Sequence, residues 1–404
     1  MTAEAPVQTA RRSAVAMYTL LSVMFINILG FGIVVPLLPF YGASFHAPPW
    51  QIALIFSAYS LGSFVGEPFW GRLSDRVGRK PILVFTVLGN CACYGALAFA
   101  PDIWSAFAIR LVGGMAAGNG SVVQGYIADV TPPQELAGRM ARLGASYNVG
   151  FILGPFVGGV LAKPSAGPLG FQIPLLAASA LAACSALGIA LAVRESRQRR
   201  PVETNPVSPW QAVGAVARHP VIGPLVLLTF LVGLAFNGIE SVFALWAHHR
   251  FAWQPVQVGL LFGLSGLIAS PTQFLLTGVL SRRYGEARML AAGMAGSVIA
   301  LALMPFVGGG WGVYALMAAS ALASSVAFPN AGALISRAVD DRNQGQIMGL
   351  NNATSAISRV IGPQAASLAF AFAGADSPFF LGAILTVPAI FLALRAGRAA
   401  TTSA

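Results

Sequence analysis

Two glutamates and two arginines, Arg110 and Arg359, lie inside long apolar stretches, where charged side chains are rare. Glu67, Glu240 and Arg110 are each flanked on both sides by mostly apolar residues. A carboxyl group surrounded by hydrocarbon favours its neutral form, so it can take up and release protons at physiological pH. A buried arginine is costly and usually faces a partner or a water-filled cavity. We therefore regard Glu67, Glu240 and Arg110 as candidates for proton coupling.

Each of these three residues also has a structural interpretation. Glu67 comes shortly before a basic turn and could be a fixed partner of that turn. Glu240 lies in the outer half of its helix and could belong to the outer mouth. Arg110 could extend its side chain outward to the membrane surface. However, it lies about 10 Å from the outer boundary, which is a long distance for the side chain to cover.

A cluster of charges fills the short segment 71–81, Gly-Arg-Leu-Ser-Asp-Arg-Val-Gly-Arg-Lys-Pro. Five charges cannot sit in hydrocarbon, and four positive ones place the turn in the cytoplasm. Gly71 and Gly78 allow close backbone approach or a positive φ. Asp75 can bond the backbone of the turn or the N-terminal end of a neighbouring helix. A generic cytoplasmic loop is the simpler alternative, but it does not require this spacing.

Membrane helices are needed to position these residues. Of the 404 residues, 56% are apolar and only 9% are charged, whereas a soluble domain carries about a quarter charged residues. Twelve apolar runs are long enough to cross a bilayer, which predicts an all-α membrane protein with twelve transmembrane helices. We expect them at about 14–40, 51–72, 81–100, 103–128, 140–162, 172–193, 221–246, 255–280, 288–306, 311–336, 346–372 and 377–395.

The net charge of +11 does not indicate nucleic-acid binding, because 20 of the 24 Lys and Arg residues fall in the termini and alternate loops. This positive-inside bias predicts that both termini are cytoplasmic. The basic, proline-rich segment 194–220 is expected to be a cytoplasmic linker with a short surface helix around 209–217. The domains are then residues 1–193, a six-helix bundle, the linker 194–220, and residues 221–404, a second six-helix bundle.

Cysteine usage gives no indication of a cofactor. Cys91 and Cys93 do not share a helix face, and together with Cys184 they are interpreted as small core residues. We expect no metal, no cofactor and no disulfide framework.

The two halves of the chain resemble each other. Gly-x-Leu-Ser recurs at 71–74 and 278–281, a shift of 278 − 71 = 207. Gly-Pro recurs at 154–155 and 362–363, a shift of 362 − 154 = 208. Nearly the same shift across several helices indicates a duplicated six-helix unit.

Segment 71–81 resembles the loop between helices 2 and 3 of the major facilitator superfamily, Gly-x-Leu-x-Asp-Arg-x-Gly-Arg-Lys/Arg, at every fixed position. Transporters of this superfamily consist of two six-helix bundles related by a pseudo-twofold axis. Because Asp75 aligns with Arg282 in the second half, we expect only the first copy to gate. The resemblance implies gating roles for Gly71, Asp75, Arg76, Gly78 and Arg79.

Two further segments resemble motifs of this superfamily. Arg110 and the Gly/Ala run to Gly118 resemble a motif linked to proton transfer, although Gly113 replaces the usual Gln. Segment 150–159 matches the antiporter motif Gly-x-x-x-Gly-Pro-x-x-Gly-Gly, which marks exporters that exchange substrate for protons. Plain helix packing is the alternative for both motifs, because Gly and Pro are common in membrane helices.

The antiporter motif has a simple physical reading. Gly150, Gly154 and Gly158 repeat every four residues and form one flat helix face. Pro155 removes a backbone hydrogen bond and can kink the helix. We expect this flat face to pack against the other bundle, with Gly154 and Pro155 contributing to gating.

The first helix resembles that of tetracycline and multidrug exporters, but Asn27 stands where many of them have Asp. An amide cannot bind and release a proton, so the proton role shifts toward Glu67, Glu240 or Asp75. The resemblance also pairs Asp129 with Arg79 and directs Asp75 toward the start of the eleventh helix, near Gly345. Both contacts would hold the bundles closed on the cytoplasmic side, and protonation of Asp75 would release them.

The resemblance also implies which side chains line the central cavity. Aromatic rings with a few amides suit large amphipathic molecules better than sugars. The candidates for substrate binding are Asn27, Tyr59, Arg110, Gln124, Tyr147, Asn148, Phe236, Asn237, Glu240, Trp246, Gln273, Asn330, Asn351 and Asn352.

Our main hypothesis is proton-driven export of hydrophobic or cationic drugs by alternating access. The alternative is a facilitator or symporter for a metabolite, sugar or lipid. This alternative stays open because Asn27 replaces the Asp that many exporters have in the first helix. An intramembrane protease using Ser265 would need a later His as base, and no His follows His249. An ATP-driven pump would need a Gly-x-x-x-x-Gly-Lys-Ser/Thr loop, and the sequence has none.

These considerations predict a transporter that is not an enzyme. Its expected partners are a small-molecule substrate, protons and the lipid bilayer, with no nucleic acid, and we expect a monomer. Arg exceeds Lys by 22 to 2, a composition typical of a GC-rich bacterial genome. The predicted location is therefore the bacterial inner membrane.

Overall fold

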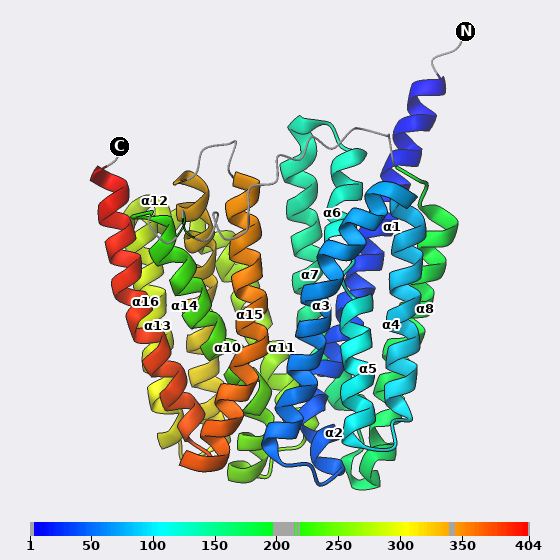
Figure 1. Ribbon diagram of the computed structural model, residues 1–404. Coiled ribbons are helices and arrows are strands. Elements are labelled where there is room, and N and C mark those ends of the chain that lie inside the picture. Colours follow the sequence, from blue (N-terminus) through cyan, green and yellow to red (C-terminus); the bar gives the residue numbers. More distant parts are fainter. Residues whose placement is uncertain (1–3, 197–213, 215, 217–218, 339–343, 403–404) are drawn as a thin grey trace. The chain divides into compact units, whose positions relative to one another are not determined.

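The computed structural model describes residues 4–196, 214, 216, 219–338 and 344–402. Every regular element in this part of the chain is a helix (Figure 1). The first half contains α1 (Glu4–Val34), η1 (Val35–Leu37), α2 (Leu38–Ser44), α3 (Pro49–Val77), α4 (Arg79–Ala98), α5 (Ile103–Ala116), α6 (Gly120–Asp129), α7 (Pro133–Leu161), η2 (Pro164–Phe171) and α8 (Gln172–Ala192).

The second half repeats this order with small differences. It contains α10 (Ile222–Phe251), α11 (Pro255–Pro271), the π-helical turn η3 (Thr272–Leu276), α12 (Thr277–Tyr284), α13 (Glu286–Leu303), η4 (Met304–Phe306), α14 (Gly310–Arg337), α15 (Gln344–Ala373) and α16 (Ser377–Thr402). The predicted linker 194–220 and its short helix fall mostly outside the described residues.

The described residues hold twelve helical stretches that are long and apolar enough to cross a membrane. They run from Thr19–Ser44, the first, to Ser377–Arg398, the last, and each overlaps one of the predicted spans. The prediction of an all-α protein with twelve transmembrane helices is therefore confirmed. Many large apolar side chains remain exposed on these helices, as lipid-facing residues should.

Local sequence explains where these helices start and stop. Asp102 caps α5, because its side chain accepts hydrogen bonds from the backbone amides of Trp104 and Ser105 at 2.8 and 2.9 Å. Hydrogen bonds from the backbone and hydroxyl of Ser105 lower the pKa of the Asp102 carboxyl. Gly78 and Gly285, with φ of 122° and 86°, separate α3 from α4 and α12 from α13. Glycine adopts such positive φ values without steric penalty.

Several spans are interrupted rather than straight. The fourth span breaks at residues 117–119 between α5 and α6. The eighth changes to the π-helical turn η3 directly after Pro271. Interruptions of this kind leave backbone groups outside the regular hydrogen-bond ladder, and membrane proteins tolerate them where they are buried in protein or line a cavity.

The chain divides into two compact units. One comprises residues 1–47, 58–202 and 254–263, and the other residues 48–57, 203–253 and 264–404. The start of α3 and the start of α11 are therefore each grouped with the unit formed mainly by the other half. The predicted boundaries at 193 and 220 remain a prediction.

The same helix pairs recur in both halves. α1 packs on α7 and α8, and α4 packs on α5 and α8. α10 packs on α15 and α16, and α13 packs on α14 and α16. These are corresponding elements at the shift of about 208 residues, so the duplication extends to the packing inside each half.

Candidate functional site

Arg79 connects the ends of three helices in the charged segment 71–81. Its Nη2 lies 2.8 Å from Asp75 Oδ1 at the end of α3. Its Nε donates to Asp129 Oδ2 at the end of α6 at 3.2 Å, and its Nη1 donates to Ser74 Oγ at 2.7 Å. The Arg79–Asp129 pair named from the sequence is thus in contact. Its role in gating remains a prediction.

The guanidinium of Arg79 fits over a glycine of α6. An ideal Cβ built on Gly125 would lie 2.7 Å from Arg79 Cζ. Gly71 similarly faces Ser121 Oγ, which would lie 3.3 Å from its Cβ. Small residues on α3 and α6 therefore let the charged segment lie close against the fourth span. Arg76 occupies the last turn of α3.

The start of α4 is capped by Glu195, a residue that the sequence analysis did not single out. Glu195 Oε1 accepts the backbone N–H of Arg79 at 2.8 Å, and Oε2 accepts that of Lys80 at 3.1 Å. An ideal Cβ on Gly78 would lie 2.5 Å from Glu195 Oε2, so a side chain at this position would displace the carboxylate. A negative group at a helix N-terminus is favoured by the unpaired amides and the helix dipole.

Arg110 is buried on α5, with 3% of its surface exposed. Its Cζ lies 4.1 Å from the centre of the Tyr59 ring, which itself packs on Phe31 with centroids 5.4 Å apart. Its Nε has no hydrogen-bond partner among the described residues. A cation held over an aromatic face is stabilised by the ring quadrupole. The arginine therefore lies inside the protein rather than reaching outward to the membrane surface.

Glu67 lies beside the break in the fourth span. The backbone of Glu67 accepts a hydrogen bond from Ser121 Oγ at 3.2 Å. An ideal Cβ on Gly120, the first residue of α6, would lie 3.5 Å from Glu67 Oε1 and 3.8 Å from Tyr147 Oη. The carboxyl group is thus close to the N-terminal end of α6. Among the described residues, no ion pair joins it to the basic turn.

Glu240 lies on α10 near Arg359 of α15, which is close enough to interact with it electrostatically. The two helices approach closely here, because an ideal Cβ on Gly238 would lie 2.8 Å from the carbonyl oxygen of Gly362. Glu240 and Arg359 therefore bring opposite charges to neighbouring membrane helices. Arg359 was recognised from the sequence only as a membrane arginine, without a partner.

The glycines of the antiporter motif pack against α1. An ideal Cβ on Gly154 would lie 2.6 Å from Gly32 Cα, and one on Gly150 would lie 2.8 Å from the carbonyl oxygen of Phe25. Gly158 meets the carbonyl oxygen of Ile33. The expectation that these three glycines pack on the other bundle was wrong, because α1 and α7 belong to the same half. The adjacent Gly159 meets Pro255, at the start of α11.

The substrate candidates of the first half differ in exposure. Asn27 is buried on α1. Tyr59 lies under Arg110, and Tyr147 lies beside Glu67. Asn148 is half-buried on α7, and Gln124 is exposed on α6. Two of these residues, Tyr59 and Tyr147, therefore lie beside the two charged groups of this half.

The candidates of the second half fall into two groups. Two of the five amides donate to the carbonyl four residues earlier in their own helix: Asn237 to that of Gly233 at 2.6 Å, and Asn330 to that of Val326 at 2.7 Å. Asn351 keeps a buried Oδ1 without a partner among the described residues. Phe236 (51% exposed), Gln273 in the π-helical turn and Asn352 are exposed, whereas Trp246 is fully buried and donates to Asp376.

Comparison with known proteins agrees with this arrangement of helices. The family model described as Major Facilitator Superfamily matches residues 20–276 and 225–403. The chain belongs to the Major Facilitator Superfamily. A protein of this superfamily with twelve spans is a multi-pass membrane transporter.

Relatives within the superfamily include drug-resistance proteins. The tetracycline resistance protein, class C, of Escherichia coli is 28% identical over 356 residues, covering 86% of this chain and 88% of that protein. Multidrug resistance protein 2 of Bacillus subtilis is 25% identical over 356 residues, covering 87% and 88%. Among solved structures, the human organic anion transporter MFSD10 aligns with a TM-score of 0.69 at 23% identity, covering 94% of this chain and 99% of that one.

Proposed function

We propose that this superfamily member exports hydrophobic or cationic small molecules in exchange for protons, by alternating access. The observation on which this rests is the antiporter motif of α7, present at every position and packed glycine to glycine on α1. Similarity to tetracycline and multidrug resistance proteins along most of the chain supports the same cargo class.

We assign proton coupling to the carboxyl groups of Glu67, Glu240 and Asp75. Glu67 lies at the broken fourth span, beside Tyr147, and Glu240 lies opposite Arg359. Within a membrane, a carboxylate gains or loses its proton readily when the local charge or hydration changes. We assign Asp75 the regulation of gating and treat Arg110 as the cation that responds to the proton. Asn27 is buried but cannot titrate.

In the proposed mechanism, the residues around Arg79 hold the bundles closed on the cytoplasmic side. In the proposal, Arg79 holds Asp75 and Asp129 together while Gly71, Arg76 and Gly78 shape the turn. Asp75 in its charged form favours one conformation through the start of α15, near Gly345, and its protonation releases that contact. Gly154 and Pro155 let α7 and α1 move as one close-packed pair.

The cargo contacts would come from both halves. Aromatic surface is offered by Tyr59, Tyr147 and Phe236, and hydrogen-bonding groups by Asn148, Asn237, Gln273, Asn330 and Asn351. Few charges stand among them, which suits large amphipathic molecules. Asn237 and Asn330 would have to exchange their present backbone bonds for cargo bonds. Asn351 has a buried Oδ1 with no partner among the described residues, so it could accept a hydrogen bond from the cargo without breaking another one.

We place the protein in the inner membrane of a bacterium with both termini in the cytoplasm. The positive-inside distribution of Arg and Lys supports this orientation. We propose that it works as a monomer without a cofactor and catalyses no covalent reaction.

The test is a drug-susceptibility panel in a bacterium that lacks its own pumps. Expression should protect the cells against tetracyclines or lipophilic cations, and a protonophore should remove the protection. In proteoliposomes, an imposed drug gradient should move protons in the opposite direction. Uptake of a metabolite down its gradient, with no drug-driven proton movement, would instead favour the alternative function of a facilitator, which is consistent with Asn in place of Asp at position 27.

A further inference from the structure

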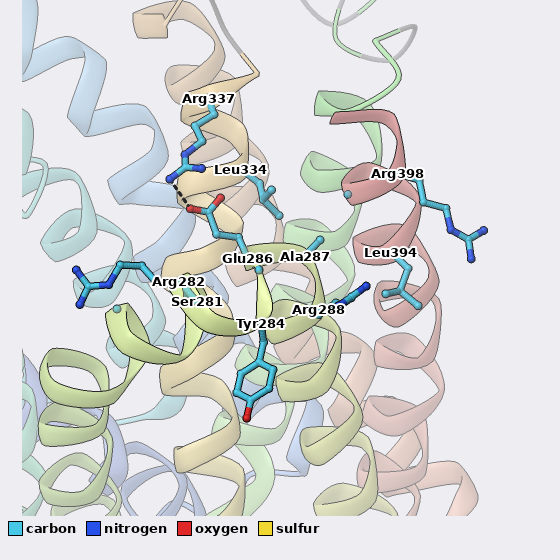
Figure 2. Close-up of a pocket in the computed structure, with 13 residues that line it drawn as sticks. Ser281, Arg282, Tyr284, Glu286, Ala287, Arg288, Leu334, Arg337, Leu394 and Arg398 are labelled. Carbon is cyan, nitrogen blue, oxygen red and sulfur yellow. Dashed lines mark ion pairs between the residues drawn. The ribbon is translucent and has the colours of Figure 1, made fainter. Parts of the chain in front are cut away.

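A cavity of about 940 Å³ lies at the membrane-surface ends of α12, α13, α14 and α16 (Figure 2). Four arginines line it, Arg282, Arg288, Arg337 and Arg398, with Glu286 as the acid among them. Arg337 Nη2 pairs with Glu286 Oε1 at 2.9 Å, while Arg282 and Arg398 lie at opposite sides of the cavity in Figure 2. The positive charge of the lining exceeds the negative charge by three.

This cavity is the counterpart of the charged segment in the first half. Gly285 corresponds to Gly78 and Glu286 to Arg79, at a shift of 207, and Arg337 corresponds to Asp129 at 208. The Arg79–Asp129 pair therefore recurs as Glu286–Arg337 with the signs exchanged. The replacement of Asp75 by Arg282 is thus accompanied by an exchange of signs in the neighbouring ion pair.

The first half shows what the geometry at such a turn accepts. There, the carboxylate of Glu195 accepts two amides at the start of α4 and lies against Gly78. At Gly285, which also has a positive φ, no atom of the described residues other than the glycine and its two chain neighbours lies within 4 Å of an ideal Cβ. No side chain of the described residues accepts the first amides of α13. Space for an anion is therefore present where the first half supplies its own.

We propose that this cavity binds the phosphate group of an anionic lipid. Phosphate oxygens accept hydrogen bonds from amides at a helix N-terminus and from arginine in a bidentate geometry. Ser281 adds a buried hydroxyl on the cavity wall that has no partner among the described residues. Basic pockets between transmembrane helices at a membrane surface suit anionic headgroups.

The apolar part of the lining favours a lipid over a free phosphate ion. Tyr284, Leu334 and Leu394 line the cavity beside the arginines. Exposed apolar side chains continue along the same helices, with Val279 on α12 and Phe391 on α16. A headgroup in the cavity would therefore find a surface for its acyl chains next to it. In the proposed orientation, this lipid comes from the cytoplasmic leaflet.

Lipid binding can be measured without transport. The purified protein is stripped of lipid in detergent and titrated with phosphatidylglycerol, cardiolipin or phosphatidylcholine under native mass spectrometry. The wild type should hold the anionic lipids about tenfold more tightly than phosphatidylcholine. The double variant Arg282→Gln/Arg288→Gln should weaken anionic-lipid binding about tenfold to thirtyfold.

The matched control is Arg283→Gln/Arg395→Gln, which removes the same charge from α12 and α16 outside the cavity lining. It should bind anionic lipid within about twofold of the wild type. Equal losses in both double variants would reveal a diffuse charge effect and overturn the site. Inorganic phosphate should neither displace the lipid nor raise the melting temperature as the lipid does; if it does both, the site is one for a free anion. Because the readout is binding, failure here leaves the transport proposal standing.

Discussion

The carboxylate of Glu195 accepts the backbone N–H of Arg79 at 2.8 Å, across 116 residues of chain. This contact holds Glu195, three residues after the end of the sixth span, against the start of the third. Arg79 in turn holds Asp75 and Asp129. The orientation of the charged segment therefore depends on an acid that lies outside the segment and outside its motif.

Replacing Glu195 by Ala should destabilise the protein by about 1 kcal/mol, because two amides at the start of α4 lose their acceptor. Glu195→Gln should lie between Ala and the wild type, since one oxygen remains. Thermal unfolding in detergent measures the effect, and hydrogen exchange should speed up at the amides of Arg79 and Lys80. Ser196→Ala is the control, because its hydroxyl reaches Asp129 but not these amides. Unchanged exchange in Glu195→Ala would show that the cap is dispensable.

Asp75→Asn should leave the protein folded and inserted but abolish or strongly slow export. Asp75 is 41% exposed and pairs with Arg79, four residues later across the turn at Gly78, and such exposed pairs contribute only about 0–1 kcal/mol to stability. A large functional loss would therefore reflect gating rather than unfolding. Efflux of a fluorescent drug from cells measures it. The same change at Asp102, where Asn also caps a helix well, should have no effect; wild-type efflux by Asp75→Asn would remove Asp75 from the mechanism.

The spans could be predicted from the sequence because a bilayer imposes a length and an apolar composition on each helix. The charged turn and the Arg79–Asp129 pair followed from a resemblance that covers short, contiguous motifs. Glu195 could not be found in this way, because its partners are backbone amides far away in sequence. The signal available was an acid directly after a span, within an otherwise basic run.

The packing partner expected for the three-glycine face of the antiporter motif was wrong for a related reason. A flat glycine face predicts that another helix packs closely against it, but the glycine spacing does not identify that helix. Gly32 on α1 provides the answer, since two glycines facing each other permit the closest approach. The break at 117–119 had a local signal, Ala-Gly-Asn-Gly, and the π-helical turn after Pro271 had the proline; neither was used.

Glu240 and Arg359 should behave as a coupled pair. Glu240→Gln removes the carboxylate beside Arg359 and should destabilise the protein by about 1–2 kcal/mol. The double variant Glu240→Gln/Arg359→Gln should recover part of this loss, with a coupling energy of about 1 kcal/mol. Denaturant titration in detergent supplies the four values of the cycle. The pair Glu135–Arg139, at 3.0 Å and with an exposed carboxylate, is the control and should couple by only about 0.3–0.5 kcal/mol.

The same variant also tests proton exchange. Glu240→Gln and Glu67→Gln each remove a titratable group. The drug-driven change of pH inside proteoliposomes should therefore be smaller for the variant that lacks the proton-exchanging residue. Drug binding in that variant should also lose its dependence on pH. If both variants move protons like the wild type, neither membrane glutamate couples the proton, and Asp75 is left as the titrating group.

Gly154→Ala should damage the protein far more than Gly144→Ala, although both changes add one methyl group to α7. At Gly154 the new Cβ would meet Gly32 Cα at 2.6 Å, and backbone cannot move aside as a flexible side chain does. Separating α1 from α7 should cost about 1–3 kcal/mol, seen as a lower melting temperature and weaker export. At Gly144 nothing lies within 4 Å, so alanine should be neutral or stabilise the helix by up to about 1 kcal/mol. If Gly154→Ala melts with the wild type, the helices are not locked by this glycine contact, and the motif must act through Pro155 and Gly159 instead.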